Sequence, residues 1–100
     1  MSVVVAGTFR IPPEKLGDLR PHLEAVIAAT RAEDGCLIYS YAVDVQDPGL
    51  IRVFEHWRDH AALDAHFQTP HMTAWKEVRA PLGFHDRAIS VYEVGTVREI

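Results

Sequence analysis

Cysteine is nearly absent from this chain, in which Cys36 is the one thiol among 100 residues. A lone cysteine excludes an intramolecular disulfide framework and a zinc site built on cysteines. Lysine is scarce as well, with two residues, and the arginines are scattered singly through a chain whose formal net charge is −4. Because nucleic-acid and anionic-membrane surfaces need clustered Lys and Arg, this composition argues against both partners.

Long hydrophobic runs are also missing. No segment approaches the length of a membrane-spanning helix, and no charged stretch precedes an apolar one at the start, as a signal peptide requires. We therefore expect a cytoplasmic protein. One hundred residues, almost half of them apolar, are enough for one globular domain with a modest core, covering residues 1–100.

Several motifs of cofactor and catalytic sites are missing too. The chain has no glycine-rich phosphate loop, no Gly-x-Ser-x-Gly elbow and no Cys–His pair at a recognisable spacing. His56 and His60 straddle a strand end and a helix start, so they do not share one helical face. His66 and His71 stand five residues apart across a helix break, with no third ligand at a telling spacing. We expect no metal and no cofactor.

Hydrophobic periodicity predicts elements in the order strand, helix, strand, strand, helix pair, strand. The predicted strands are residues 3–9, 36–45, 50–57 and 84–97, and the first helix covers residues 14–33. Pro21 removes one backbone hydrogen bond from that helix, which predicts a kink or a separate short first turn. Gly35 suits the left-handed conformation that follows a last helical turn. This order is that of the ferredoxin-like βαββαβ fold of the α+β class, a four-stranded antiparallel sheet with helices on one face.

Both faces of the predicted third strand carry apolar side chains. Alternation places Ile51, Val53, Glu55 and Trp57 on one face and Leu50, Arg52, Phe54 and His56 on the other. Helices can cover one of these faces, and the apolar side chains of the other would be exposed to solvent in a monomer. The pattern therefore predicts a homodimer.

The helix pair carries the candidate chemistry. Asp59 is placed to cap the first helix, and Thr69 followed by Pro70 is typical of a helix start. Helical spacing puts Ala62, Leu63, His66 and Phe67 on one apolar stripe, and His71, Ala74, Trp75, Val78 and Leu82 on the next. Titratable groups in apolar stripes at a helix junction indicate a small buried reaction chamber.

Residues 33–36 (EDGC), Tyr39, residues 55–57 (EHW) and above all residues 63–72 (LDAHFQTPHM) resemble the antibiotic biosynthesis monooxygenase family. The likeness covers nearly the whole chain and is nearest to the bacterial quinol monooxygenases. It implies a dimeric α+β barrel in which two sheets pack face to face, with a pocket between each protomer's sheet and helices. It also implies oxidation of electron-rich phenolic or quinol-type small molecules by dioxygen, without flavin or metal.

Such a reaction needs a base that works near neutral pH, an aromatic pocket and donors that steady a developing anion. His66 and His71 are the candidate catalytic bases. The candidate substrate-binding residues are Tyr39, Tyr41, Arg52, Phe67 and Trp75. The rings supply apolar surface, and the guanidinium would hold an anion.

Each candidate also has a structural interpretation. His66 can be a core histidine bonded to a carbonyl, and His71 can cap its own helix. Tyr39 and Tyr41 can pack in a dimer interface, and the strand face of Arg52 can be solvated. Glu55, beside Trp57, either pairs with an arginine or orients a histidine.

Two other functions stay open at this point. One is a dimeric small-molecule binding or stress-response protein of the same fold without turnover. The other is a small-sugar-phosphate isomerase that uses His66 or His71 for proton transfer, although neither lysine is placed to hold a phosphate. The haem-cleaving branch of the family relies on an asparagine in the first strand, and residues 3–10 contain none.

Overall fold

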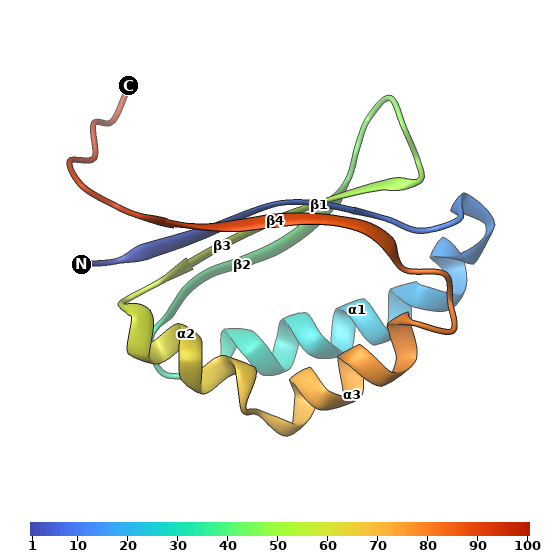
Figure 1. Cartoon of the computed structure of the whole chain (residues 1–100), viewed down its shortest axis with the longest axis horizontal. Helices are drawn as coiled ribbons and strands as arrows, with labels where there is room; N and C mark the ends of the chain where they lie inside the picture. Colours follow the sequence, from blue (N-terminus) through green and yellow to red (C-terminus); the bar gives the residue numbers. More distant parts are fainter.

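The strands and helices follow the predicted order in the computed structural model, which describes all 100 residues. One antiparallel sheet has the order β2-β3-β1-β4 and consists of β1 (Val3–Arg10), β2 (Cys36–Val43), β3 (Leu50–Trp57) and β4 (His85–Glu93). The other elements are the 3₁₀ turn η1 (Pro13–Lys15) and helices α1 (Leu16–Arg31), α2 (His60–Phe67) and α3 (Pro70–Arg79). All three α-helices cover one face of the sheet (Figure 1). The ferredoxin-like α+β prediction is confirmed.

The first helix is shorter than predicted at both ends. A separate first turn, η1, precedes α1, as one of the two expectations had it, and α1 then runs without a break through Pro21. Pro21 is tolerated because the carbonyl that it leaves unpaired belongs to Gly17, at the exposed start of the helix. Glu33, predicted inside the helix, lies after it, in the turn where Gly35 adopts the expected left-handed φ of 84°. No helix is long and apolar enough to cross a bilayer.

Two side-chain caps set the junction between α2 and α3. Asp59 Oδ1 accepts a hydrogen bond from the Ala62 N–H at 2.8 Å and so caps α2. Thr69 caps α3 ahead of Pro70, as predicted, and its hydroxyl donates to the His66 carbonyl oxygen at 2.8 Å. This last bond joins the end of α2 to the start of α3, where both candidate histidines lie.

The buried faces of these helices differ in part from the predicted stripes. Phe67 and Ala74, which were predicted to be buried, are exposed, and Met72 is buried instead. The reason is that α3 packs against α1 as well as facing the sheet. Met72 belongs to the hydrophobic cluster that joins α1 to the sheet, so the inward face of α3 is turned toward it.

Two strands also depart from their predicted patterns. A bulge between Cys36 and Ile38 makes Leu37 an extra residue in β2, and its side chain is exposed. The bulge therefore interrupts the alternation of side chains that a regular strand would show from Cys36 onward. The last strand, β4, ends at Glu93, short of its predicted end, because its one neighbour, β1, begins at Val3 directly opposite.

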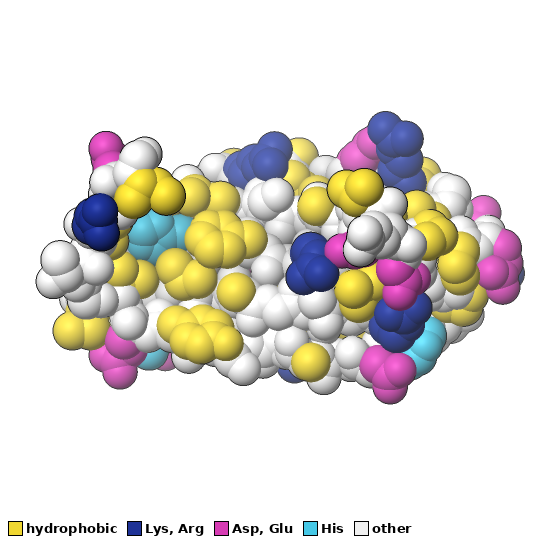
Figure 2. All heavy atoms as spheres, turned by 90° about the horizontal axis from the view of Figure 1, so that it is seen from above, with side chains coloured by type: hydrophobic (Ala, Val, Ile, Leu, Met, Phe, Trp, Pro, Cys, Tyr) yellow, Lys and Arg dark blue, Asp and Glu magenta, His cyan; other side chains and the backbone are white.

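The strand β3 divides its side chains between two surfaces, as its pattern predicts. Glu55 and Trp57 face the helices and are buried. The opposite surface, called here the open face, carries Ile38, Phe54 and Tyr92, which are 45%, 43% and 56% exposed. Figure 2 shows hydrophobic side chains gathered on this face, which no helix covers.

Gly7 lets the edge strand β4 approach β1 closely. A Cβ at this position would meet the carbonyl oxygen of Ala88 and would lie 2.6 Å from Cα of Ile89. Only glycine fits between two backbones at such a distance. The close approach brings the β4 side chains Arg87 and Ile89 to the helix-covered side of the sheet, where they line a pocket.

Candidate active site

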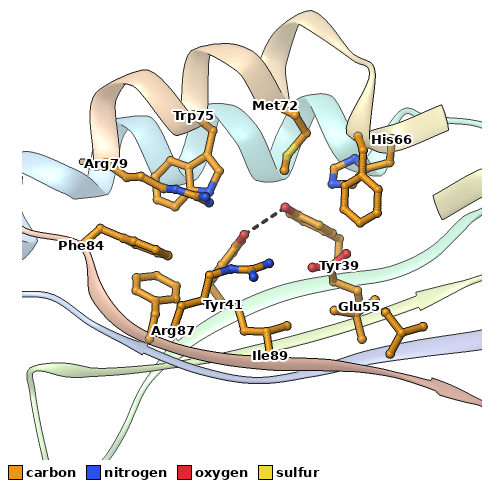
Figure 3. A pocket seen from close by; sticks show the side chains of 14 residues that line it. Tyr39, Tyr41, Glu55, His66, Met72, Trp75, Arg79, Phe84, Arg87 and Ile89 are labelled. Carbon is orange, nitrogen blue, oxygen red and sulfur yellow. Dashed lines mark hydrogen bonds between the residues drawn. The ribbon is translucent and has the colours of Figure 1, made fainter. Parts of the chain in front are cut away.

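The pocket lies between the helix-covered face of the sheet and helices α2 and α3. It contains about 530 Å³ of empty space, including the part open to solvent. Figure 3 shows its wall, with side chains from α2 and α3 on one side and from the strands on the other. Four predicted substrate-binding residues, Tyr39, Tyr41, Phe67 and Trp75, are among the residues that line it. Such an aromatic wall suits a flat ring.

The hydroxyl groups of Tyr39 and Tyr41 meet inside the pocket, 3.0 Å apart (Figure 3). Both side chains face the helices rather than the open face, so packing at the open face of a dimer is not their role. Burial raises the pKa of Tyr41 to about 12, and it also raises the pKa of Tyr39. Both phenols therefore stay neutral at pH 7. One of them donates its O–H to the other, and the second O–H is free to donate a hydrogen bond to a ligand oxygen.

His66 lines the pocket and is anchored by a carboxylate that does not. Its Nδ1 lies 2.6 Å from Glu33 Oε2, and the same oxygen lies 2.8 Å from Nε2 of His71. Glu33 comes from the turn before β2, His66 from the last turn of α2 and His71 from the first turn of α3. Three segments that are distant in sequence thus meet at one carboxylate oxygen.

This shared oxygen determines which nitrogens carry protons. A carboxylate can only accept hydrogen bonds, so both nitrogens that face Glu33 present an N–H. The proton of a neutral His66 is therefore on Nδ1, and Nε2 keeps a free lone pair. Burial lowers the pKa of His66 and outweighs the opposite effect of its bond to Glu33. At neutral pH His66 is uncharged, and Nε2 is available as a base.

The second candidate base, His71, does not line the pocket. It is 23% exposed and lies with His22 and Trp75 in a shallow groove between α1 and α3. A substrate held in the pocket reaches His71 only through His66 and Glu33. The structure therefore brings the two histidines together but gives them different positions relative to the pocket.

Glu33, His66 and His71 are also possible metal ligands, since their donor atoms all lie within 4.8 Å of one another. Glu33 is distant in sequence from the two histidines, so sequence spacing alone does not reveal it as a third ligand. In the present geometry the imidazoles both donate to one oxygen, so a cation would have to displace two protons. The expectation of no metal stays a prediction.

Glu55 is a second acid in the pocket wall, and it is buried. Its Oε1 accepts a hydrogen bond from the Trp57 indole N–H at 2.9 Å, and no arginine or histidine pairs with it. Neither role expected from the sequence, pairing with an arginine or orienting a histidine, is therefore seen. Burial raises the pKa of Glu55 to about 7, although the bond from Trp57 acts in the opposite direction. Glu55 changes its charge close to neutral pH.

The cationic groups of the pocket are Arg79 and Arg87, and Arg52 is not one of them. Arg52 lies on the open face, where its Nε is 2.9 Å from Asp44 Oδ1, which matches the solvated interpretation of that strand face. Arg79 ends α3, and its guanidinium carbon lies 4.3 Å from the centre of the Phe84 ring. Arg87 projects from β4.

Sequence motifs do not identify Glu33, Arg79 and Arg87 as site residues. Glu33 has one signal, its place in the segment 33–36 that carries the family resemblance. Arg79 stands one helical turn after Trp75, which puts both on the same side of α3. That spacing is weak on its own, because basic residues are common in last helical turns.

Proteins similar to this chain share its whole fold. A candidate antibiotic biosynthesis monooxygenase from Deinococcus radiodurans is 32% identical, with a TM-score of 0.89 over 100% of this chain and 98% of that chain. Rv0793 of Mycobacterium tuberculosis, named as a candidate monooxygenase, is 31% identical with a TM-score of 0.79 over 99% and 98%. The Synechocystis protein sll1783 is 32% identical over 98 residues, which are 98% of this chain and 67% of that protein.

The family profile described as antibiotic biosynthesis monooxygenase matches residues 2–78. That match runs from β1 almost to the end of α3, and it includes Glu33, Glu55, His66 and His71. The segments that carry the resemblance therefore include His66, which lines the pocket, and Glu33, which is hydrogen-bonded to it. On the profile match and the full-length structural similarity, this chain belongs to the antibiotic biosynthesis monooxygenase family.

Proposed function

We propose that this protein is a cofactor-independent monooxygenase that oxidises a phenolic, quinol-like or polycyclic aromatic small molecule with dioxygen. The proposal depends above all on His66, which lines an aromatic pocket while Glu33 engages its Nδ1–H. A neutral imidazole held in one tautomer is suited to accept a proton from a phenol. Membership of the family and relatives named as candidate monooxygenases support the same class of reaction.

The proposed reaction starts with proton transfer from the substrate to Nε2 of His66. The resulting anion passes one electron to dioxygen, and the substrate radical combines with superoxide to form a carbon–oxygen bond. The peroxide is protonated and loses water, which leaves a carbonyl group on the ring. The substrate loses two hydrogens and gains one oxygen atom, and the second oxygen leaves as water. The Tyr39–Tyr41 pair has one O–H that is not used within the pair, and this O–H donates a hydrogen bond to the anionic intermediates.

The positive charge that His66 gains in this proposal is balanced by Glu33. Protonation of Nε2 makes the Nδ1–H more acidic, and that proton faces Glu33 Oε2 at 2.6 Å. The same oxygen accepts the Nε2–H of partly exposed His71 at 2.8 Å. His71 is then a positioning residue, since it holds Glu33 in place and does not contact the pocket.

Purified protein is expected to consume dioxygen when it is given hydroquinones and polycyclic phenols, and EDTA is expected to leave the rate unchanged. The reason is that the substrate supplies all four electrons that reduce dioxygen to one carbonyl oxygen and one water, and His66 takes the proton, so neither metal nor flavin is needed. An oxygen electrode measures the rate with and without chelator, and with heat-denatured protein as the control. Loss of turnover on chelation, with recovery on adding one divalent metal, would contradict the proposal and make Glu33, His66 and His71 its ligands.

A homodimer is the proposed working form, and sedimentation at micromolar concentration is expected to give twice the monomer mass of 11.2 kDa. The open face exposes Ile38, Phe54 and Tyr92, and a second copy that covers it should bury about 1,500 Å² or more in total. Phe54→Asp is expected to shift the mass to that of a monomer. Arg20→Gln, on the outer side of α1, is the matched control and should not shift it. A monomeric wild-type protein would rule out the dimer.

A small-sugar-phosphate isomerase is the second candidate, because Arg79 and Arg87 supply the cationic groups that a phosphate needs. His66 would then move a proton between neighbouring carbons. The aromatic and aliphatic wall favours the oxygenase, since a sugar has no ring face of comparable apolar area. Incubation with a ketose phosphate, followed by NMR, would detect the isomer.

A further inference from the structure

Two guanidinium groups in the pocket have no carboxylate partner. Arg79 and Arg87 both line it, and neither takes part in any ion pair of the protein. The arginines that do pair with a carboxylate all lie outside the pocket and are Arg10, Arg20, Arg52 and Arg58. Arg79 is half-buried and Arg87 is exposed to solvent, so two unpaired guanidinium groups on one pocket wall are free to bind an anion there.

The surroundings of the two groups do not neutralise their positive charge. Burial, and to a smaller extent the charge of Arg87, lower the pKa of Arg79, so the two cations act on each other. Glu55 is the one acid that lines the pocket, and it interacts with the charge of Arg87 without forming an ion pair, while its Oε1 accepts the Trp57 N–H. One buried acid that is partly protonated at neutral pH does not neutralise two guanidinium groups.

The pocket also has two different ends. In Figure 3 Arg79 and Phe84 lie at one end and His66 at the other, with Tyr41 and Tyr39 between them. A ligand that spans the pocket meets Arg79 at one end, Arg87 beside the two phenol hydroxyls in the middle, and the His66 imidazole at the far end (Figure 3). The wall between these groups is mainly aromatic and aliphatic.

We propose that the pocket selects an aromatic carboxylate, whose anionic group is bound by Arg79 and Arg87 while its ring lies against Trp75 and Tyr41. A planar carboxylate matches the flat guanidinium fork in two parallel hydrogen bonds, and the stacked aromatic wall favours a ring over a sugar. The identification of this ligand as a substrate rests on the proposed function. Binding itself does not require turnover.

Calorimetry under nitrogen tests the inference, with 1-hydroxy-2-naphthoate and the corresponding neutral amide as probes. The acid is expected to bind at least about 10-fold more tightly than the amide, because the amide cannot form the charge-assisted hydrogen bonds that the carboxylate forms with the guanidinium groups. In the Arg79→Gln/Arg87→Gln double variant the two affinities are expected to become nearly equal. Arg20→Gln is the control: it leaves the guanidinium groups of Arg79 and Arg87 in place and should keep the preference for the acid over the amide. The two single variants, each expected to lose part of the preference, serve if the double variant does not fold.

Equal affinity for acid and amide in the wild-type protein would overturn the inference, and so would a preference that survives in folded Arg79 and Arg87 variants. Tighter binding of ribose 5-phosphate than of the naphthoate would overturn the assignment of an aromatic carboxylate as the ligand. It would show instead that Arg79 and Arg87 bind a phosphate group. A clear preference for the acid together with no oxygen uptake would support the binding site and refute the proposed monooxygenase reaction. The two proposals can therefore fail separately.

Discussion

His66→Gln is expected to lower the rate of oxygen uptake by at least about 10²-fold, because a glutamine at position 66 cannot accept a proton near neutral pH. Glutamine has a similar volume, and its amide N–H can still donate to Glu33, so the free energy of unfolding should fall by about 1.5 kcal/mol or less. Oxygen uptake and thermal unfolding measured on the same preparations check both parts. A large fall in melting temperature with full activity in the folded fraction would make His66 a structural residue.

A pH profile separates the base from the residues that position it. Burial lowers the pKa of His66, so the wild-type rate should fall only below the ordinary histidine range near pH 6.5. Glu33→Gln and His71→Gln leave Nε2 of His66 in the pocket, so these variants should lose less rate and should move the acidic limb of the profile. His22→Gln, in the groove beside His71 but without a bond to Glu33, is the matched control.

Glu55→Gln is expected to stabilise the protein at pH 8 by up to about 3 kcal/mol relative to its effect at pH 4.5. The pKa of Glu55 is raised from an ordinary value of 4.5 to about 7 in the folded protein. Its contribution to stability is therefore complete below pH 4.5 and is lost as the pH rises through 7, where the buried group must ionise. Glutamine stays neutral, and its amide oxygen can still accept the Trp57 N–H at the position of Oε1.

Denaturant unfolding of both proteins from pH 4.5 to pH 8 measures this effect. The difference between variant and wild type isolates Glu55, because His66 titrates in the same range with the opposite sign. The lowered pKa of His66 means that stability is gained as the pH rises through its range. Glu93→Gln, an exposed carboxylate at the end of β4, is the control and should show no such difference. A difference that does not change with pH would show that Glu55 ionises normally.

The order of elements and the family could be predicted from the residues alone. Alternation in β2 and β3, leucine spacing in α1 and the Thr69–Pro70 start of α3 are local signals, because each depends on neighbours within a few residues. Where the predictions from these signals are wrong, the cause is a contact between elements that are distant in sequence. β4 ends where β1 begins, and Met72 turns inward because α3 packs on α1.

The candidate site divides in the same way. The tyrosines, Trp75 and His66 were recognisable as residue types on apolar faces, and the structure brings them to one pocket. Arg52 shows the limit of that approach, since an arginine on a strand faces either side according to register, and this one faces away from the pocket. The cations that do reach the pocket come from α3 and β4 and share no local pattern.

The sequence by itself determined the fold class, the family and the presence of imidazoles among apolar side chains, because helical and strand periodicity are properties of short segments. Only the tertiary structure decided which of these groups meet. Glu33, His66 and His71 come from three separate segments, and their shared oxygen exists only because the turn before β2 reaches the α2–α3 junction. The tautomer of His66, the raised pKa of Glu55 and the unpaired guanidinium groups all follow from burial and long-range contact, which no local pattern encodes.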